Sequence, residues 1–154
     1  MFKRFMSAMV LCGGMGLAGL AAAQDTPTLT LEMAERAMTA AVAESRANNW
    51  NLTIAIVDAA GVPVMIHRMD GASPRSFDIA LAKARVVTAT GLSSGEYGRR
   101  LQAGEIAEVE NGVTFAGGVP IVRNGERIGA ITSSGARAID DEQVSLAGAA
   151  VLAE

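Results

Sequence analysis

The sequence predicts a single α+β domain in which helices pack against a mostly antiparallel sheet. Two observations carry this prediction. Apolar runs are joined twice by short glycine-containing turns, Asp58–Gly61 and Asn124-Gly125, a pattern typical of β-hairpins. Longer segments with apolar residues at helical spacing stand before, between and after these hairpins. Consecutive hairpins favour antiparallel pairing, so we expect the helices to cover the sheet rather than to link parallel strands.

The first 23 residues have the pattern of a secretion signal. Lys3 and Arg4 form a basic start, a stretch of apolar and small residues follows, and three alanines precede Gln24. A membrane anchor is the alternative, but the stretch is short for a span and is interrupted by glycine. We therefore expect residues 1–23 to be removed as a signal peptide and residues 24–154 to form the domain, in the periplasm or outside the cell.

The composition of residues 24–154 excludes several classes of function. Without Lys3 and Arg4 the segment has 11 basic and 16 acidic residues, a net charge of −5, which disfavours nucleic acid or an anionic membrane as partner. The only cysteine, Cys12, lies in the signal, which excludes disulfides, thiolate metal sites and thiol nucleophiles. A single histidine, His67, excludes a two-histidine metal site within one chain. The sequence has no P-loop and no nucleophile elbow.

The first half of the domain is predicted to contain a helix, a hairpin and a second helix. Residues that favour helix ends mark the helix boundaries: Thr30 and Asn48 for the first, Ser73-Pro74 and Gly91 for the second. The hairpin strands are expected over residues 52–57 and 62–69. This order places both hairpin strands between two helices that can cover the sheet.

The second half is predicted to contain a short helix, another hairpin and a last helix. Capping patterns mark the two helix starts: Ser93 with Glu96, and Asp140 with Gln143. Val113–Phe115 is predicted to form an additional short strand before the hairpin. The tight turn sets the expected cross-strand pairs: Ile121 with Ile128, and Arg123 with Glu126.

The strand that holds the lone histidine is the strongest candidate for a site. His67 and Arg68 stand just before a polar turn, and alternation places Met65, His67 and Met69 on one side of the strand and Arg68 on the other. The alternatives are a surface or hydrogen-bonded histidine and methionines that fill the core. Lys83 lies at the edge of the apolar stripe of the second helix, where it either snorkels to solvent or meets a ligand.

A pair of glycines forms a second candidate region. Gly117 and Gly118 follow Phe115 and precede the second hairpin. Glycine at such a position lets the backbone come close to another strand or to a ligand. We therefore keep Phe115, Gly117 and Gly118 as candidate binding residues.

Taken together, the motifs of the chain resemble those of the GlcG/HbpS family. The resemblance is carried, in order and with family-like spacing, by Leu29–Met38, Thr53–Asp58, Arg68–Ala72, the helix pattern Ser76, Ala80, Lys83 and Ala84, Phe115–Pro120, and Ile128–Ile131 with Ser133–Gly135. It covers essentially the whole domain, and the relatives of this family include the C-terminal domain of PduO-type proteins. The resemblance implies a profilin-like or PAS-like fold, a homo-oligomer such as an octamer, haem as ligand, and a sensor or operon protein as partner.

Three functions are compatible with this resemblance. We favour an exported haem-binding protein for haem sensing, buffering or delivery, without robust turnover. The alternatives are an enzyme that degrades haem or acts on a small organic acid, and a structural or regulatory oligomer without ligand. For haem binding we expect His67 to ligate the iron, since imidazole is a common axial ligand, and Lys83 or a nearby arginine to contact a propionate. The other expected contacts are Arg68, Met69, Phe115, Gly117 and Gly118.

The secretion signal can be tested directly. N-terminal sequencing of the exported protein should give a first residue near Gln24, because the alanines before it match the small-residue cleavage pattern. An exported protein that retains Met1 would contradict this prediction.

Overall fold

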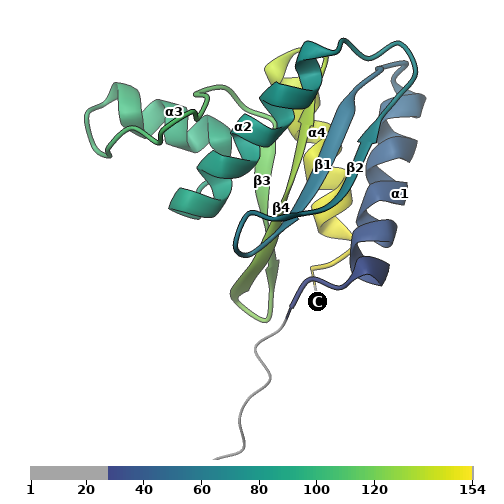
Figure 1. Ribbon diagram of the computed structural model, residues 1–154, viewed down its shortest axis with the longest axis horizontal. Coiled ribbons are helices and arrows are strands. Elements are labelled where there is room, and N and C mark those ends of the chain that lie inside the picture. Colours follow the sequence, from purple (N-terminus) through teal and green to yellow (C-terminus); the bar gives the residue numbers. More distant parts are fainter. Residues whose placement is uncertain (1–27, 154) are drawn as a thin grey trace, which may run out of the picture.

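The structure, a computed structural model, describes residues 28–153, and the expected signal peptide lies outside them. Its helices and strands are, in order, α1 (Leu31–Ala47), β1 (Thr53–Asp58), β2 (Pro63–Arg68), α2 (Arg75–Thr90), α3 (Ser94–Gln102), β3 (Gly118–Arg123), β4 (Glu126–Ser134) and α4 (Ala138–Ala150). Helices α1 and α4 cover one face of the sheet and α2 covers the other, while α3 extends away from it (Figure 1). The predicted α+β class is therefore confirmed.

The four strands form one antiparallel sheet in the order β2-β1-β4-β3. Side chains of β1 alternate between its two faces. Ile54 and Ile56, with Leu52 just before the strand, are fully buried in the main core beneath α1 and α4. On the other face, Val57 belongs to a smaller cluster of short side chains under α2. The sheet thus separates two environments, and each site residue can be assigned to one of them from its register.

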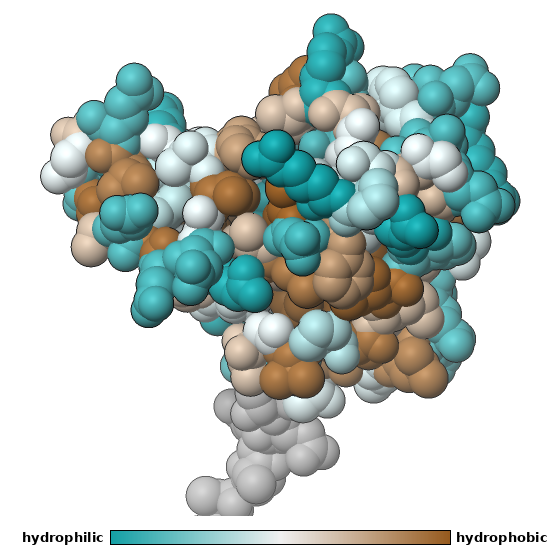
Figure 2. All heavy atoms as spheres, turned by 45° about the horizontal axis from the view of Figure 1, so that its top comes forward, coloured by the Kyte–Doolittle hydropathy of each residue, from teal (hydrophilic) through white to brown (hydrophobic). Residues whose placement is uncertain are grey.

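Strand β2 forms one edge of the sheet and is only partly covered. Its side chains are half-buried or exposed, and Val62 just before it is 58% exposed. Figure 2 shows hydrophobic side chains at the surface over the strands, between α2 and α1, with hydrophilic side chains around them. An edge strand with accessible apolar side chains leaves this part of the domain open to a ligand or to another chain.

Most predicted helix boundaries are confirmed. The Thr30 hydroxyl accepts the Met33 N–H at 3.2 Å and caps α1. The Ser93 hydroxyl accepts the Glu96 N–H at 3.2 Å and caps α3. Gly91 ends α2 with a φ of 73°, the left-handed conformation that glycine adopts without strain.

The start of α2 differs from the prediction in its cap. The helix begins at Arg75 after Pro74, and no side chain caps it. Ser73 contributes its backbone carbonyl, which accepts the Ser76 N–H at 3.0 Å, instead of its hydroxyl. The first N–H groups of α2 therefore receive no side-chain cap.

The start of α4 lies before the predicted one. The helix begins at Ala138, so Asp140 lies in its first turn and does not cap it. The Asp140 carboxylate instead accepts two hydrogen bonds from Arg137, at 2.6 and 2.8 Å. The capping prediction for Asp140 and Gln143 is therefore wrong, because the helix starts earlier and the Asp140 carboxylate binds the Arg137 guanidinium.

The second hairpin confirms the turn but only part of the register. The pair beside Asn124-Gly125 is the predicted one, and both turn residues have positive φ. Farther along, Ile121 lies opposite Gly129 and not opposite Ile128. A bulge leaves Ile128 as an extra residue of β4, which shifts the remaining pairs by one position.

The additional strand predicted at Val113–Phe115 is not formed. The carbonyl of Thr114 lies so close to Gly98 of α3 that a side chain at position 98 would collide with it. The segment therefore packs against α3 instead of pairing with the sheet.

A buried ion pair joins α2 to α4 at one end of the sheet. Lys83 is fully buried, and its Nζ lies 2.8 Å from Oδ2 of Asp141. The same ammonium donates to the Ser133 carbonyl of β4 at 2.7 Å. The second carboxylate oxygen of Asp141 accepts the Ala136 N–H at 2.9 Å. One ammonium thus fixes α2, the end of β4 and the start of α4 relative to each other.

Removing the negative partner of this pair should strongly destabilise the domain. Asp141→Asn is expected to lower the free energy of unfolding by about 3–5 kcal/mol, because it leaves the Lys83 ammonium buried without a counter-charge. The midpoint of urea unfolding measures the change.

The neighbouring aspartate provides a matched control. Asp140→Asn should shift the midpoint much less, because its partner Arg137 has an 80% exposed side chain and the pair is screened by solvent. Equal shifts for the two variants would show that burial of the Lys83 pair does not matter for stability.

Candidate functional site

The predicted site residues lie in two groups on opposite faces of the sheet. His67 is paired with Ile54, and residues directly opposite each other point to the same face. Since Ile54 is buried under α1 and α4, His67 faces α1. Lys83 reaches the end of β4 from α2, on the other face. The two residues that we expected to contact one haem are therefore separated by the sheet.

The imidazole of His67 is exposed where two hollows meet between α1 and β2. The polar hollow, of about 280 Å³, is lined by Arg46, Asn51, His67, Arg68, Met69 and Asp70. The apolar hollow, of about 330 Å³, is lined by Met38, Thr39, Val42, Ala43, Arg46 and His67. We call the two together the α1–β2 groove. His67 and Arg46 line both hollows, so they stand at the boundary between its apolar and polar parts.

The residues beside His67 have structural partners. Met65 and His67 share one face of β2, as alternation predicted. Met69 is 9% exposed within the main core, and Met65 packs against that core. Arg68 donates to the Ala72 carbonyl at 2.8 Å across the turn. The methionines thus fill the core, and among these residues the imidazole is the group that remains accessible as a ligand.

The second group surrounds the buried ammonium. The centroid of the Phe115 ring lies 5.4 Å from Lys83 Nζ, within the range of a cation–π contact. Gly117 has a φ of 123°, and a side chain there would collide with Lys83 Nζ. The Gly117 carbonyl accepts the Ser133 N–H at 2.7 Å and the Ser145 hydroxyl at 2.9 Å. The backbone at Gly117 therefore comes close to a strand and to an ammonium.

Gly118 has a similar packing role. It begins β3 opposite Thr132, and its N–H donates to the Ser94 hydroxyl at 2.9 Å. A side chain at position 118 would crowd Lys83 and Thr132. Both glycines thus allow the loop to pack tightly between α2 and β4.

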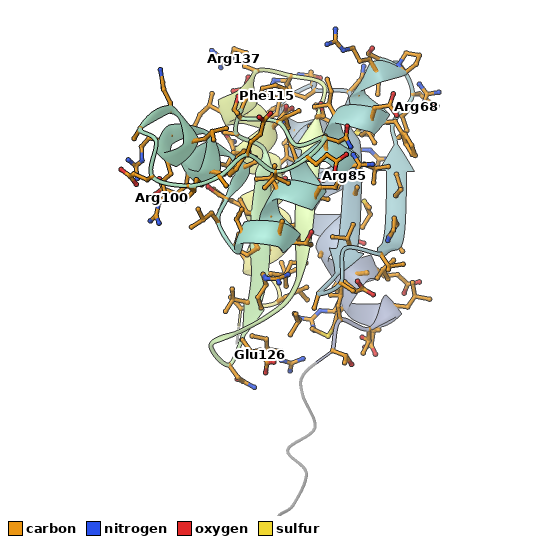
Figure 3. The ribbon with its side chains drawn as sticks, turned by 60° about the vertical axis from the view of Figure 1, so that its left-hand side comes forward. Arg68, Arg85, Arg100, Phe115, Glu126 and Arg137 are labelled. Carbon is orange, nitrogen blue, oxygen red and sulfur yellow. The ribbon has the colours of Figure 1, made fainter. Side chains whose placement is uncertain are left out.

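Burial affects both members of the Lys83–Asp141 pair. Desolvation lowers the pKa of the Lys83 ammonium and raises the pKa of the Asp141 carboxyl, while their mutual attraction opposes both shifts. Phe115 and Asp141 also line a cleft of about 220 Å³ between the first turns of α2 and α4. Figure 3 shows Phe115, Arg137 and Arg68 at one end of the sheet and Glu126 at the other. The two groups therefore lie at the same end of the sheet, on different faces.

The donor set at His67 suits haem better than a bare metal ion. Within residues 28–153, no three His, Cys, Asp or Glu side chains come together in a way that could hold a metal. A single imidazole is a sufficient protein ligand for an iron that brings porphyrin nitrogens with it.

Within residues 28–153, no helix is both long enough and apolar enough to cross a membrane.

Arg46 and Asp141 belong to these groups but were not predicted from the sequence as site residues. Arg46 follows Met38 and Val42 at intervals of four along α1, which places it on the stripe that reaches the groove. Asp141 precedes Val144 by three residues on the inward stripe of α4. A charged residue on an inward helical stripe signals a buried partner, and this signal could have identified Asp141.

Comparison with known proteins gives consistent relatives. Protein GlcG of Escherichia coli K12 is 34% identical over 113 residues, which are 67% of this chain and 78% of GlcG. A double mutant of Streptomyces reticuli HbpS is 33% identical with a TM-score of 0.76, covering 97% of this chain and 99% of HbpS. A structure described as a PduOC:haem complex is 24% identical, with a TM-score of 0.75. It covers 83% of this chain and 100% of its own, and it shows the common fold.

A family model agrees with these relatives. The model, described as "Haem degrading protein HbpS-like", matches residues 29–150, nearly all of the chain that the structure describes. The match includes both groups of site residues. The chain therefore belongs to the HbpS-like family.

Proposed function

We propose that the protein is an exported haem-binding protein that senses, buffers or delivers haem without robust turnover. The observation that carries this proposal is the position of His67, the only imidazole of the sequence, exposed where the apolar and polar parts of the α1–β2 groove meet. Haem needs an axial ligand, an apolar surface for the macrocycle and cations for its propionates. Membership of a family described by haem chemistry supports the same ligand.

Each of these needs can be assigned to a residue of the groove. His67 would ligate the iron through its imidazole. Met38 and Val42 of α1 would contact the macrocycle, and Arg46 would face a propionate at the boundary of the two hollows. When bound, haem would supply the iron centre and its redox chemistry, while these side chains would hold and orient it.

Lys83 is a weaker candidate for the propionate contact than the arginines. Its ammonium is buried, and Asp141 and Ser133 already accept its hydrogen bonds. A propionate could reach it only by displacing these partners, at the cost of a buried ion pair. We therefore assign the propionate contact to Arg46, which is exposed on the same face as His67.

A homo-oligomer, such as the octamer that the family resemblance implies, would complete the site. The two hollows lie near or below the lower end of the roughly 300–1,000 Å³ typical of ligand pockets, so one chain would leave much of a haem in solvent. A second chain could cover the exposed part. Ile139 and Leu146, which are 64% and 54% exposed on α4, also support burial against another chain.

Haem degradation is the second candidate function. The observation in its favour is the description of the family, which names degradation. Binding and degradation both require the haem to be held at the groove, and they differ in whether the macrocycle survives reduction of the iron.

The His67 assignment predicts two different spectroscopic effects. Haemin added to the mature protein should give a Soret band, and His67→Ala should shift that band, because the iron loses its axial ligand. Arg46→Ala should leave the band in place and weaken haemin binding by about 1–3 kcal/mol, the scale of a charge-assisted hydrogen bond. Absorbance titrations measure both.

Arg85→Ala is the matched control, because Arg85 is an exposed arginine of α2 that lines neither hollow of the groove. An unchanged spectrum and affinity in His67→Ala would remove His67 from the site. Adding ascorbate to the loaded protein separates the candidate functions: a stable band supports binding, and loss of the band with release of iron supports degradation. A chain that gives no band with haemin would favour the oligomer without ligand.

Light scattering tests the oligomer. The mature protein should have a mass several times that of one chain at micromolar concentration, and Ile139→Asp with Leu146→Asp should reduce that mass if α4 lies in the interface. A monomeric mature protein would contradict the proposal.

A further inference from the structure

We propose that the cleft between the first turns of α2 and α4 binds a small organic carboxylate. We call it the helix-start cleft. It is lined by the start of α2, the end of β4 with the turn that follows, and Phe115. It shares no lining residue with the α1–β2 groove, so this ligand is distinct from the haem proposed above.

Positive potential converges on this cleft from two helices. Neither α2, which starts after Pro74, nor α4, which starts after Arg137, has a side-chain cap. The uncapped N–H groups of a helix start, together with the helix dipole, favour an anion. Arg75 lines the cleft and is exposed, and among the described residues it has no ion-pair partner.

An unpartnered hydroxyl on a largely buried residue points to a ligand independently of the helices. Ser134 is 4% exposed and lines the cleft, and its hydroxyl makes no hydrogen bond to any residue in the described part of the chain. Ser134 is paired with Thr53, whose hydroxyl lies 2.7 Å from that of Ser76, so both strand residues point toward α2. The hydroxyl therefore has a free hydrogen-bond donor at the cleft, and a carboxylate oxygen there would accept from Ser134.

The one carboxylate inside the cleft would not repel this ligand strongly. Asp141 lines the cleft, but Lys83 Nζ lies 2.8 Å from one of its oxygens and the Ala136 N–H lies 2.9 Å from the other. The buried ammonium compensates its charge. Two more carboxylates stand in the first turns of these helices: Asp140 is paired with Arg137, and Asp78 does not line the cleft. Arg75 and the two helix starts are therefore the positive groups that face the ligand.

Apolar walls favour an organic anion over an inorganic one. Ile79, Phe115 and Ala138 line the same cleft, and Phe115 is 44% exposed. A carboxylate bound to Arg75 and Ser134 could place a short aliphatic or aromatic group against these side chains. The volume of about 220 Å³ suits a ligand with one short aliphatic chain or one aromatic ring beside the carboxylate.

Amide chemical shifts of the mature protein, titrated with butyrate and benzoate, test the proposal. Saturable shifts should appear at residues around the cleft, such as Ser76, Gly135 and Ala138, while the neutral butyramide and benzamide should cause none. Arg75→Ala should weaken butyrate or benzoate binding at least tenfold, and Ser134→Ala should weaken it severalfold. Arg85→Ala, an exposed arginine of the same helix outside the cleft, should bind like the unchanged protein.

Three results would overturn the proposal: no saturable shifts at the cleft, equal binding of the neutral amides, or full affinity in Arg75→Ala. Inorganic phosphate that binds as tightly as the organic acids would overturn the assignment to a carboxylate. Haemin titrations of the same variants keep the two proposals separate. Arg75→Ala should retain the Soret band, and His67→Ala should retain carboxylate binding.

Discussion

The buried ion pair between Lys83 and Asp141 is the interaction on which this end of the domain depends. Removing two charges from water is expensive, and the Ser133 carbonyl and the Ala136 N–H offset part of that penalty with hydrogen bonds. The pair also explains Gly117, where a side chain would displace the ammonium. Because α2, β4 and α4 meet at one nitrogen, the helix-start cleft is preformed rather than assembled by its ligand.

Lysine and arginine side chains differ in role according to where they lie relative to the sheet. Lys83 lies among the side chains between α2 and the sheet, where burial requires a counter-charge. Arg46 lies in the last turn of α1 and Arg75 at the start of α2. Both are exposed, and each lines a hollow. A guanidinium is weakly hydrated and matches the geometry of a carboxylate, so exposed arginines suit carboxylate-bearing ligands. In this fold, the position of a cation therefore decides whether it can bind a ligand: the buried lysine is held by a counter-charge, and the exposed arginines are accessible.

Local signals predicted much of the fold, and competing contacts account for the errors. Thr30, Gly91 and the Asn124-Gly125 turn act within a few residues, so their roles are readable from the sequence. The cap expected at Asp140 was lost to a neighbouring arginine, and the bulge at Ile128 depends on the partner strand. The site was harder to predict, because His67 and Lys83 are close in sequence but separated by the sheet. The register of β2 with β1 and the contact of Lys83 with the end of β4 together reveal that separation.

The same register also connects the two proposed sites. Arg68, Thr53 and Ser134 are directly paired across β2, β1 and β4, so they form one row on the α2 face of the sheet. Arg68 lines the polar hollow beside His67 at one end of this row, and Ser134 lines the helix-start cleft at the other. Coupling between sites requires an element with two arrangements that both ligands bias. No such element links the two sites among the described residues, and they share no lining residue, so haem and a carboxylate should be able to occupy the domain together, each held by its own arginine.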